Sequence, residues 1–247
     1  MPMMLWIMIF TTLGSIGAIV GASFVLFFKN KHRNSLIVLL VSYATGTLLG
    51  SAFLGMIPKA LQKSSPMSVS ATILAGVILF FLLEKLLVWR HCHKENCEIH
   101  TRTGLLIVIG DAFHNFIDGT LIAAAFLADV RLGIITSVAV IAHEVPQEMG
   151  DFAILLVSGY SRQKAFLYNT LSASAAILGA ILGYFYFRAI EMLIPFVLAV
   201  SAASFIYIAL ADLIPGLHRT IEMKDSIMQF IFLISGIGTI ALFVLQH

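Results

Sequence analysis

Two polar stretches interrupt otherwise hydrophobic sequence: GDAFHNFIDG, from Gly110 to Gly119, and AHEVPQEMGD, from Ala142 to Asp151. Each lies within a hydrophobic run long enough to cross a bilayer, which takes about 20 residues. An ionisable side chain at that depth is costly and is a functional-site hypothesis by default. The two stretches therefore predict a polar site inside a membrane, built from Asp111, His114, Asn115, Asp118, His143, Glu144, Gln147, Glu148 and Asp151.

The composition is that of an integral membrane protein. Hydrophobic residues make up 60% of the chain and charged residues 11%, and the mean hydropathy is +0.98. Soluble domains carry about 25% charged residues. The lipid bilayer is therefore an expected partner, and the net charge of +2 gives no ground for a nucleic-acid partner. Because Cys92 and Cys97 share one short joint, a disulfide framework is excluded.

The hydrophobic runs predict an all-α, polytopic fold with eight transmembrane helices in one domain, residues 1–247. The first run has no basic start and is too long for a cleaved signal peptide, so we interpret it as a spanning helix. The expected helices cover approximately residues 5–28, 36–57, 68–88, 104–127, 132–157, 165–187, 192–214 and 227–245.

The basic residues predict the orientation, because cytoplasmic joints are enriched in Lys and Arg. With the N-terminus outside, eleven of the fifteen Lys and Arg residues fall on inside joints. Both termini are therefore expected to be non-cytoplasmic, in a multi-pass protein of the plasma (inner) membrane.

The joint at residues 90–103, RHCHKENCEIHTRT, is expected to be a cytoplasmic loop rich in metal-ligating side chains. Such a short tract is typical of weak metal binding, and equally of a plain polar loop. Its candidate ligands, ranked below those of the two stretches, are His91, Cys92, His93, Cys97 and His100.

A faint internal repeat relates the second and seventh helices. The second ends LGMIPKALQK (residues 54–63) and the seventh LADLIPGLHRT (residues 210–220), both with Ile-Pro near the exit. Because these two helices would cross the membrane in opposite directions, the pattern indicates inverted repeats, an arrangement common in secondary transporters.

The polar residues of each stretch fall on one face of a helix. At 100° per residue, His114, Asp118, Asp111 and Asn115 lie within about 100° of one another. The stripe of the next helix starts at His143 and spans about 140°, with Gln147, Asp151, Glu144 and Glu148 following in that order around the helix. Two facing stripes of this kind predict one common site.

Imidazole, carboxylate and amide groups together suit zinc and other divalent first-row metals, whereas magnesium and calcium favour all-oxygen sites. Pro146 leaves the carbonyl of Ala142 without a helical partner. A freed carbonyl at bilayer depth is tolerated where it lines a polar cavity.

Three other interpretations of these residues stay open. The polar groups could simply pair and hold two helices together, although such bonds contribute only about 0.6 to 2 kcal/mol each. HEVPQ (residues 143–147) is a degraded form of the metalloprotease motif HExxH, so an intramembrane metallohydrolase is an alternative. The same ligands would also suit a membrane metal sensor that does not transport.

The pair HNFIDG (residues 114–119) and HEVPQEMGD (residues 143–151) resembles the ZIP (Zrt- and Irt-like protein) family of divalent metal transporters. The next residues, FAILLVSGYSR (residues 152–162), resemble the branch of that family in which the fifth helix begins His-Glu-x-Pro. The resemblance implies a 3+2+3 arrangement, with helices one to three and six to eight as inverted repeats around helices four and five. It also implies alternating access, with helices one, four, five and six moving against the others.

The resemblance further implies two adjacent metal sites between helices four and five. The first would use His114, Asp118, His143 and Gln147, and the second Asn115, Asp118, Glu144 and Gln147. The remaining candidates in the two stretches, Asp111, Glu148 and Asp151, are ranked as weaker ligands.

Five positions depart from the family pattern. Gln147 replaces a usual His or Glu, and Ala176 stands where some relatives carry a carboxylate. Gly55 and Lys59 flank Pro58 where relatives often have His and Glu, and Gly216 replaces an acidic residue. We therefore expect one firm site and a weaker second one.

Together these features predict a divalent metal-ion transporter, not an enzyme, that moves its substrate into the cytoplasm. Zinc is the expected ion, with Fe²⁺, Mn²⁺ or Cd²⁺ as further substrates. No cofactor is expected to be required, and a homodimer stays open as an assembly.

Overall fold

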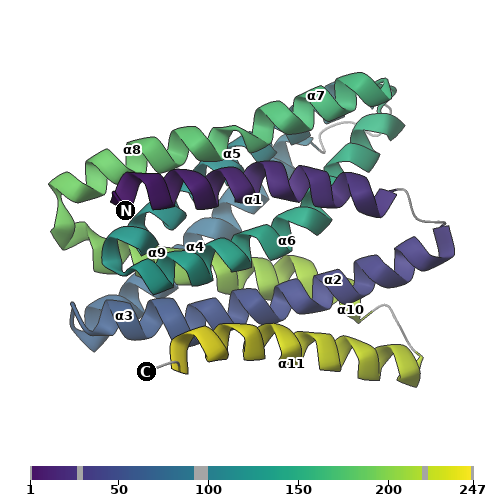
Figure 1. Cartoon of the computed structure of the whole chain (residues 1–247). Helices are drawn as coiled ribbons and strands as arrows, with labels where there is room; N and C mark the ends of the chain where they lie inside the picture. The colour runs from purple at the N-terminus through teal and green to yellow at the C-terminus, as the bar shows by residue number, and fades with distance from the viewer. Residues whose placement is uncertain (1, 27–29, 92–99, 219–221, 246–247) are drawn as a thin grey trace.

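The structure is a computed structural model that describes residues 2–26, 30–91, 100–218 and 222–245. Within these ranges the chain forms helices joined by short turns, without a β-strand (Figure 1). The helices are α1 (Met3–Leu26), α2 (Asn30–Gly50), η1 (Ser51–Met56), α3 (Ile57–Leu61), α4 (Pro66–His91), α5 (His100–Ala128), α6 (Val130–Val157), α7 (Arg162–Ala173), α8 (Ala175–Ala189), η2 (Glu191–Leu193), α9 (Ile194–Tyr207), η3 (Ile208–Leu213), α10 (Ile214–Leu217) and α11 (Met223–Leu245).

Six segments of the described residues are long and apolar enough to cross a membrane: Met3–Ser23, Ser35–Leu61, Pro66–Leu83, Arg162–Ala189, Glu191–Leu217 and Met223–Leu245. These agree with six of the eight predicted spans, and they confirm an all-α polytopic membrane protein. The other two predicted spans are α5 and α6, whose 29 and 28 residues are long enough to cross. Their polar stretches distinguish them from the other six.

The helices extend into the predicted loop at residues 90–103. Helix α4 ends at His91 and α5 begins at His100. The candidate ligands Cys92, His93 and Cys97 lie outside the described residues.

Local sequence signals set both ends of α6. Asp129 caps its start by accepting hydrogen bonds from the backbone N–H groups of Arg131 and Leu132, at 2.9 and 3.3 Å. Beyond its last turn, Gly159 adopts φ = 88°, the left-handed conformation that commonly terminates helices. The helix continues through Pro146 without a break.

Two π-helical segments occupy equivalent places in the second and seventh spans. Segment η1 leads directly into Ile57-Pro58, and η3 leads into Ile214-Pro215. Proline clashes with the carbonyl four residues earlier in an α-helix, and a π-helical turn relieves that clash. The predicted Ile-Pro repeat therefore has a structural counterpart, while the full 3+2+3 symmetry stays a prediction.

The helices associate in two groups. In one, α5 packs along α7 and α8, and α1 packs along α6. In the other, α2 packs along α11 and α4 along α9. Figure 1 shows α1, α5, α7 and α8 on one side of α6 and the α2–α11 pair on the other. The groups meet through α6 on α2 and α5 on α9.

Backbone contact at two glycines fixes α5 against α8. A Cβ atom on Gly119 would overlap the carbonyl of Ala176, and one on Gly179 would overlap the carbonyl of Phe116. Small residues allow this close approach, which is a common basis of helix packing in membranes. The contact lies directly beside Asp118.

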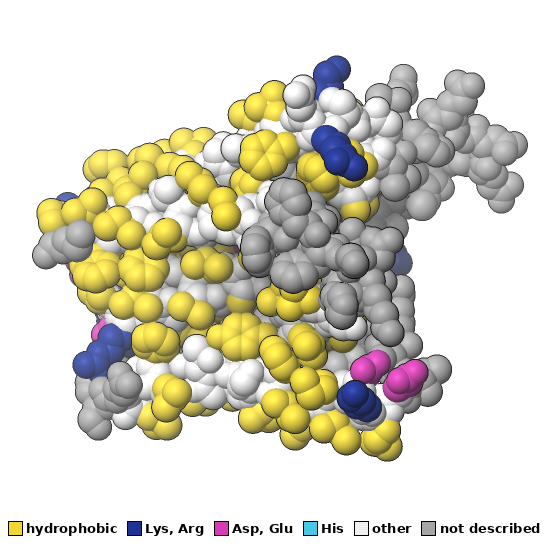
Figure 2. All heavy atoms as spheres, turned by 45° about the vertical axis from the view of Figure 1, so that its right-hand side comes forward, with side chains coloured by type: hydrophobic (Ala, Val, Ile, Leu, Met, Phe, Trp, Pro, Cys, Tyr) yellow, Lys and Arg dark blue, Asp and Glu magenta, His cyan; other side chains and the backbone are white. Residues whose placement is uncertain are grey.

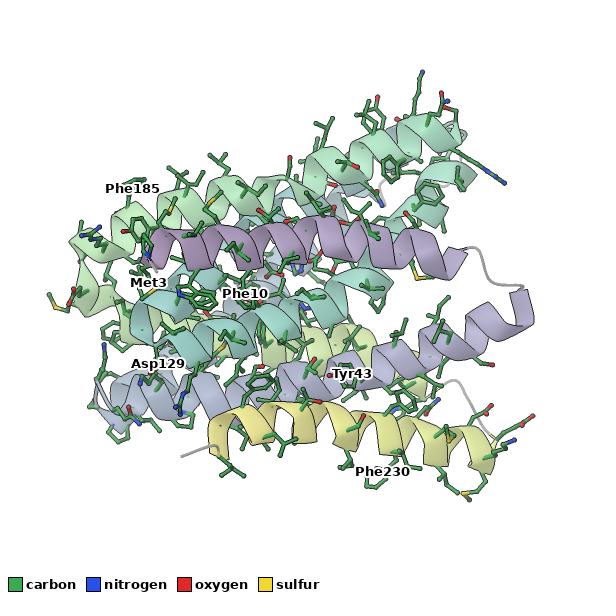
Figure 3. The ribbon with its side chains drawn as sticks, viewed as in Figure 1. Met3, Phe10, Tyr43, Asp129, Phe185 and Phe230 are labelled. Atoms are coloured by element: carbon green, nitrogen blue, oxygen red, sulfur yellow. The ribbon has the colours of Figure 1, made fainter. Side chains whose placement is uncertain are left out.

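The outer surface is hydrophobic, as a lipid-facing surface requires. In Figure 2, hydrophobic side chains are spread across the described part of the face, and most of the charged side chains lie toward its margins. Phe185 on α8 and Phe230 on α11 point away from the bundle (Figure 3), with exposures of 63% and 65%. Tyr43, by contrast, points between α2 and α11, and its hydroxyl lies 3.1 Å from that of Thr239.

Candidate metal site

His143 on α6 is held in one orientation at the centre of the bundle. Its Nδ1 lies 2.9 Å from the carbonyl oxygen of Ala139, one turn earlier, and its ring packs edge-on against Phe205 of α9. A backbone carbonyl on one imidazole nitrogen is the usual support of a metal-ligating histidine. The other nitrogen, Nε2, lies 3.2 Å from Oδ2 of Asp118 on α5.

His114 of α5 and Glu144 of α6 complete a group of four side chains. Nε2 of His114 lies 3.4 Å from Nε2 of His143 and 3.8 Å from Oδ2 of Asp118. Oε1 of Glu144 lies 3.5 Å from Nε2 of His114 and 3.7 Å from Nε2 of His143. Two nitrogens and two carboxylate oxygens thus converge on one point between α5 and α6.

These separations suit tetrahedral zinc. With zinc–nitrogen and zinc–oxygen bonds of about 2.0–2.2 Å, two ligand atoms of a regular tetrahedron lie about 3.3–3.6 Å apart. The five distances above run from 3.2 to 3.8 Å. A zinc ion therefore fits among His114, Asp118, His143 and Glu144 with little rearrangement.

Burial supports a cation at this point. Asp118, His143 and Glu144 are at most 1% exposed, and neither oxygen of the two carboxylates has a hydrogen-bond partner among the described residues. Two carboxylates buried this close together are strongly destabilising unless a positive charge neutralises them. A divalent cation is the partner that would satisfy two carboxylates and two imidazoles together.

The amide nitrogens of two predicted ligands, Asn115 and Gln147, are both bonded to Asp111. The amide nitrogen of Asn115 donates to Oδ1 of Asp111 at 3.1 Å, and that of Gln147 donates to the same oxygen, also at 3.1 Å. Both amides therefore hold Asp111. Their ligation of metal stays a prediction, and the four-atom group contains Glu144 where the expected first site has Gln147.

Two of the weaker candidates, Asp111 and Glu148, form a second group with Glu144. Carboxylate oxygens of Asp111, Glu144 and Glu148 lie within 4.8 Å of one another, and all three residues are buried. Asp151 is half-buried and lies beside Asp111. Glu144 belongs to both groups.

Three supporting residues were not predicted. The backbone carbonyl of Ala139 orients His143. Because Ala139 precedes His143 by four residues on the same helix, the sequence could have predicted this contact. Phe205 and Asn169 come from distant helices; Asn169 donates to the backbone carbonyl of Glu148 at 2.9 Å. No spacing rule could have found these two.

The positions that depart from the family pattern have structural roles of their own. The backbone carbonyl of Ala176 lies against Gly119, where α8 meets α5. Lys59, near the end of the second span, forms an ion pair of 3.2 Å with Asp129. Partial burial raises the pKa of the Asp129 carboxyl, but the bonds from Lys59 and from the N–H groups of Leu132 and Arg131 outweigh it, so the pKa is lowered overall.

The metallohydrolase alternative is not supported. A HExxH site needs metal ligands at the first and last positions of the motif. Here the last position is Gln147, whose amide nitrogen is bonded to Asp111, and Glu144 joins the ligand group.

The chain is similar to known zinc transporters. A family model described as ZIP zinc transporter matches residues 89–244. The zinc transporter ZIP13 of Pongo abelii is 31% identical over 223 residues, 83% of this chain and 66% of that protein. The zinc transporter YKE4 of Saccharomyces cerevisiae is 30% identical over 255 residues, 87% of this chain and 72% of that protein.

A further relative is much longer than this chain. The zinc transporter ZIP10 of Danio rerio is 39% identical over 144 residues, which are 56% of this chain but only 17% of that protein. The family model covers well over half of the chain, including both polar stretches and α5 to α10. The chain therefore belongs to the ZIP zinc transporter family.

Proposed function

We propose that the chain transports zinc across a membrane through the site of His114, Asp118, His143 and Glu144. The observation that carries this proposal is the near-tetrahedral spacing of four ligand atoms inside a polytopic bundle, with five of the separations between 3.2 and 3.8 Å and three of the four residues buried. The similarity to proteins named zinc transporters supports the same ion. Zinc is the substrate here, and the four side chains replace the water that it sheds.

The proposed direction of transport is toward the cytoplasm, in a chain oriented with both termini outside. Eleven of the fifteen basic residues fall on the joints that would be cytoplasmic with both termini outside, in the plasma (inner) membrane. In Figure 1 the two labelled termini lie at the same end of the bundle, which suits an even number of spans. Eight spans, including α5 and α6, satisfy this requirement.

The proposed motion separates the two helix groups. Each group is held together by close packing. In one group a Cβ atom on Gly119 would overlap the carbonyl of Ala176, and in the other a Cβ atom on Gly46 would overlap the carbonyl of Leu233. The metal ligands come from α5 and α6, in one group, while Phe205 on α9 covers His143 from the other. Sliding of one group against the other would expose the site to one side of the membrane at a time.

Other substrates and assemblies are secondary parts of the proposal. Nitrogen and oxygen ligands would also accept Fe²⁺, Mn²⁺ or Cd²⁺. No cofactor is needed for ligand exchange, and the lipid bilayer is the surrounding partner. A homodimer within the bilayer is compatible with the exposed apolar faces of α4 and α11.

Zinc uptake into proteoliposomes tests the function. We expect zinc influx with the unmodified chain, and loss of at least nine-tenths of that influx with His143→Ala. His218→Ala is the matched control, since His218 is exposed at the end of α10.

The controls separate transport from binding. Equal influx for His143→Ala and the unmodified chain would exclude this site from the pathway. Zinc binding without influx in the unmodified chain, under any imposed zinc or pH gradient, would favour the sensor over the transporter.

A further inference from the structure

Three buried carboxylates form a group next to the histidine site. Asp111 comes from α5, and Glu144 and Glu148 come from α6, with one oxygen of each within 4.8 Å of the others. Their exposures are 6%, 1% and 1%. Like charges this close repel one another, and burial removes the water that would screen them.

Several oxygens of this group have no hydrogen-bond partner among the described residues. They are Oδ2 of Asp111 and both carboxylate oxygens of Glu144 and of Glu148. Buried polar atoms are nearly always hydrogen-bonded, so unpartnered oxygens that converge on one point indicate a missing ligand. A cation is the ligand whose charge matches them.

The amides of Asn115 and Gln147 aim Asp111 at this point. Both donate to Oδ1 of Asp111 at 3.1 Å, and Asn115 also donates to the backbone carbonyl of Asp111 at 3.2 Å. With Oδ1 occupied, Oδ2 is left free for the group. A glutamate at position 147 could not donate this bond, whereas the amide of Gln147 does.

The carboxylate group is displaced from the histidine site toward one end of the bundle. Asp111 precedes Asn115 by one turn on α5, and Glu148 follows Glu144 by one turn on α6. Because the helices are antiparallel, both steps lead toward the end where α5 begins and α6 ends. In the proposed orientation this is the cytoplasmic end, and Glu144 connects the two groups.

We propose that Asp111, Glu144 and Glu148 form a second cation site that is built from oxygen alone and favours a hard divalent cation such as Mn²⁺. Oxygen ligands suit Mg²⁺, Ca²⁺ and Mn²⁺, whereas the imidazoles of the first site suit zinc. A role of this site in releasing the ion to the cytoplasm rests on the transport function proposed above. Cation binding at the site does not depend on that function.

Manganese binding to the purified full chain in nanodiscs tests the second site. Electron paramagnetic resonance counts free Mn²⁺ and so gives its dissociation constant. Glu148→Gln and Asp111→Asn should each weaken Mn²⁺ binding at least ten-fold. The double variant His114→Ala, His143→Ala should keep it within about three-fold of the unmodified chain, as should Glu191→Gln, a control at an exposed glutamate.

The visible absorption of Co²⁺ bound by the two histidines reports folding and the first site, so it should persist in Glu148→Gln and in Asp111→Asn. Unchanged Mn²⁺ affinity in both of these variants would overturn the proposal, and so would loss of Mn²⁺ binding in the double histidine variant. If one acidic variant fails to fold, the other decides. If the chain takes up no zinc but its variants bind Mn²⁺ as expected, the transport function is contradicted and the second cation site is still supported.

Discussion

Gln147 donates a hydrogen bond of 3.1 Å from Nε2 to Oδ1 of Asp111, and this bond joins the middle of α6 to α5. It turns the amide nitrogen of Gln147 toward Asp111, while Glu144, three residues earlier, approaches both histidines. The two side chains therefore have different roles, although both belong to one polar stripe.

The first prediction compares Gln147→Ala with Glu144→Gln. Removing Gln147 leaves all four atoms of the tetrahedral group in place, so the zinc dissociation constant should rise less than ten-fold. Replacing Glu144 removes a charged ligand, so zinc affinity should fall by more than the 10–100-fold typical of residues that only support ligands. Competition with a zinc chelator of known affinity measures both constants.

The opposite ranking would return Gln147 to the ligand set. If Gln147→Ala weakens zinc binding more than Glu144→Gln does, the amide oxygen binds the metal. His218→Ala, at an exposed site, controls for nonspecific zinc binding.

The second prediction concerns the contact of α5 with α8. Gly119→Ala should lower the free energy of unfolding by about 1–3 kcal/mol, because its Cβ would overlap the carbonyl of Ala176. Gly110→Ala is the matched control on the same helix, where a Cβ meets nothing within 4 Å. Thermal unfolding in detergent, followed by circular dichroism, should separate the two variants; equal stability would show that α8 does not constrain α5 here.

The sequence predicts the helices and their polar stripes, because hydrophobic length and 3.6-residue periodicity are local properties. It could not distinguish Glu144 from Gln147 as the fourth ligand, since both fall on the same face of α6. Glu148 sits at the edge of the predicted stripe, yet it is 1% exposed because α6 is surrounded by neighbouring helices. Asn169 and Phe205 depend on tertiary packing, which no local pattern encodes.

The third prediction concerns pH and the Lys59–Asp129 pair at the end of the bundle. The pKa of Asp129 is lowered from its ordinary value of 3.8 in the folded chain. The ionised carboxylate therefore stabilises the fold above pH 3.8, and this stabilisation is lost as the pH falls through the folded pKa. Asp129→Ala also removes the cap of α6 and should cost about 0.5–2 kcal/mol at neutral pH.

The stability difference between Asp129→Ala and the unmodified chain should therefore shrink below pH 3.8. Unfolding measured from pH 7 to pH 3 checks this dependence. A difference that stays constant over the whole range would rule out the charge of Asp129 as its source.

The fourth prediction concerns the contact between α7 and α6. Asn169→Ala should lower the free energy of unfolding by about 1–3 kcal/mol. It removes the side-chain amide that donates to the buried backbone carbonyl of Glu148 at 2.9 Å. Gln163→Ala, an exposed amide on the same helix, should change stability by less than about 0.5 kcal/mol. Chemical unfolding in mixed micelles compares the two, and equal losses would show that the Asn169 bond contributes nothing specific.

Zinc-edge X-ray absorption of the purified chain, loaded with less than one equivalent of zinc, tests the four-ligand site most directly. The structure predicts four nitrogen or oxygen neighbours at about 2.0–2.1 Å, with the scattering of two imidazole rings. His143→Ala should lose half of that imidazole scattering. A six-oxygen shell without imidazole scattering would contradict the site of His114, Asp118, His143 and Glu144.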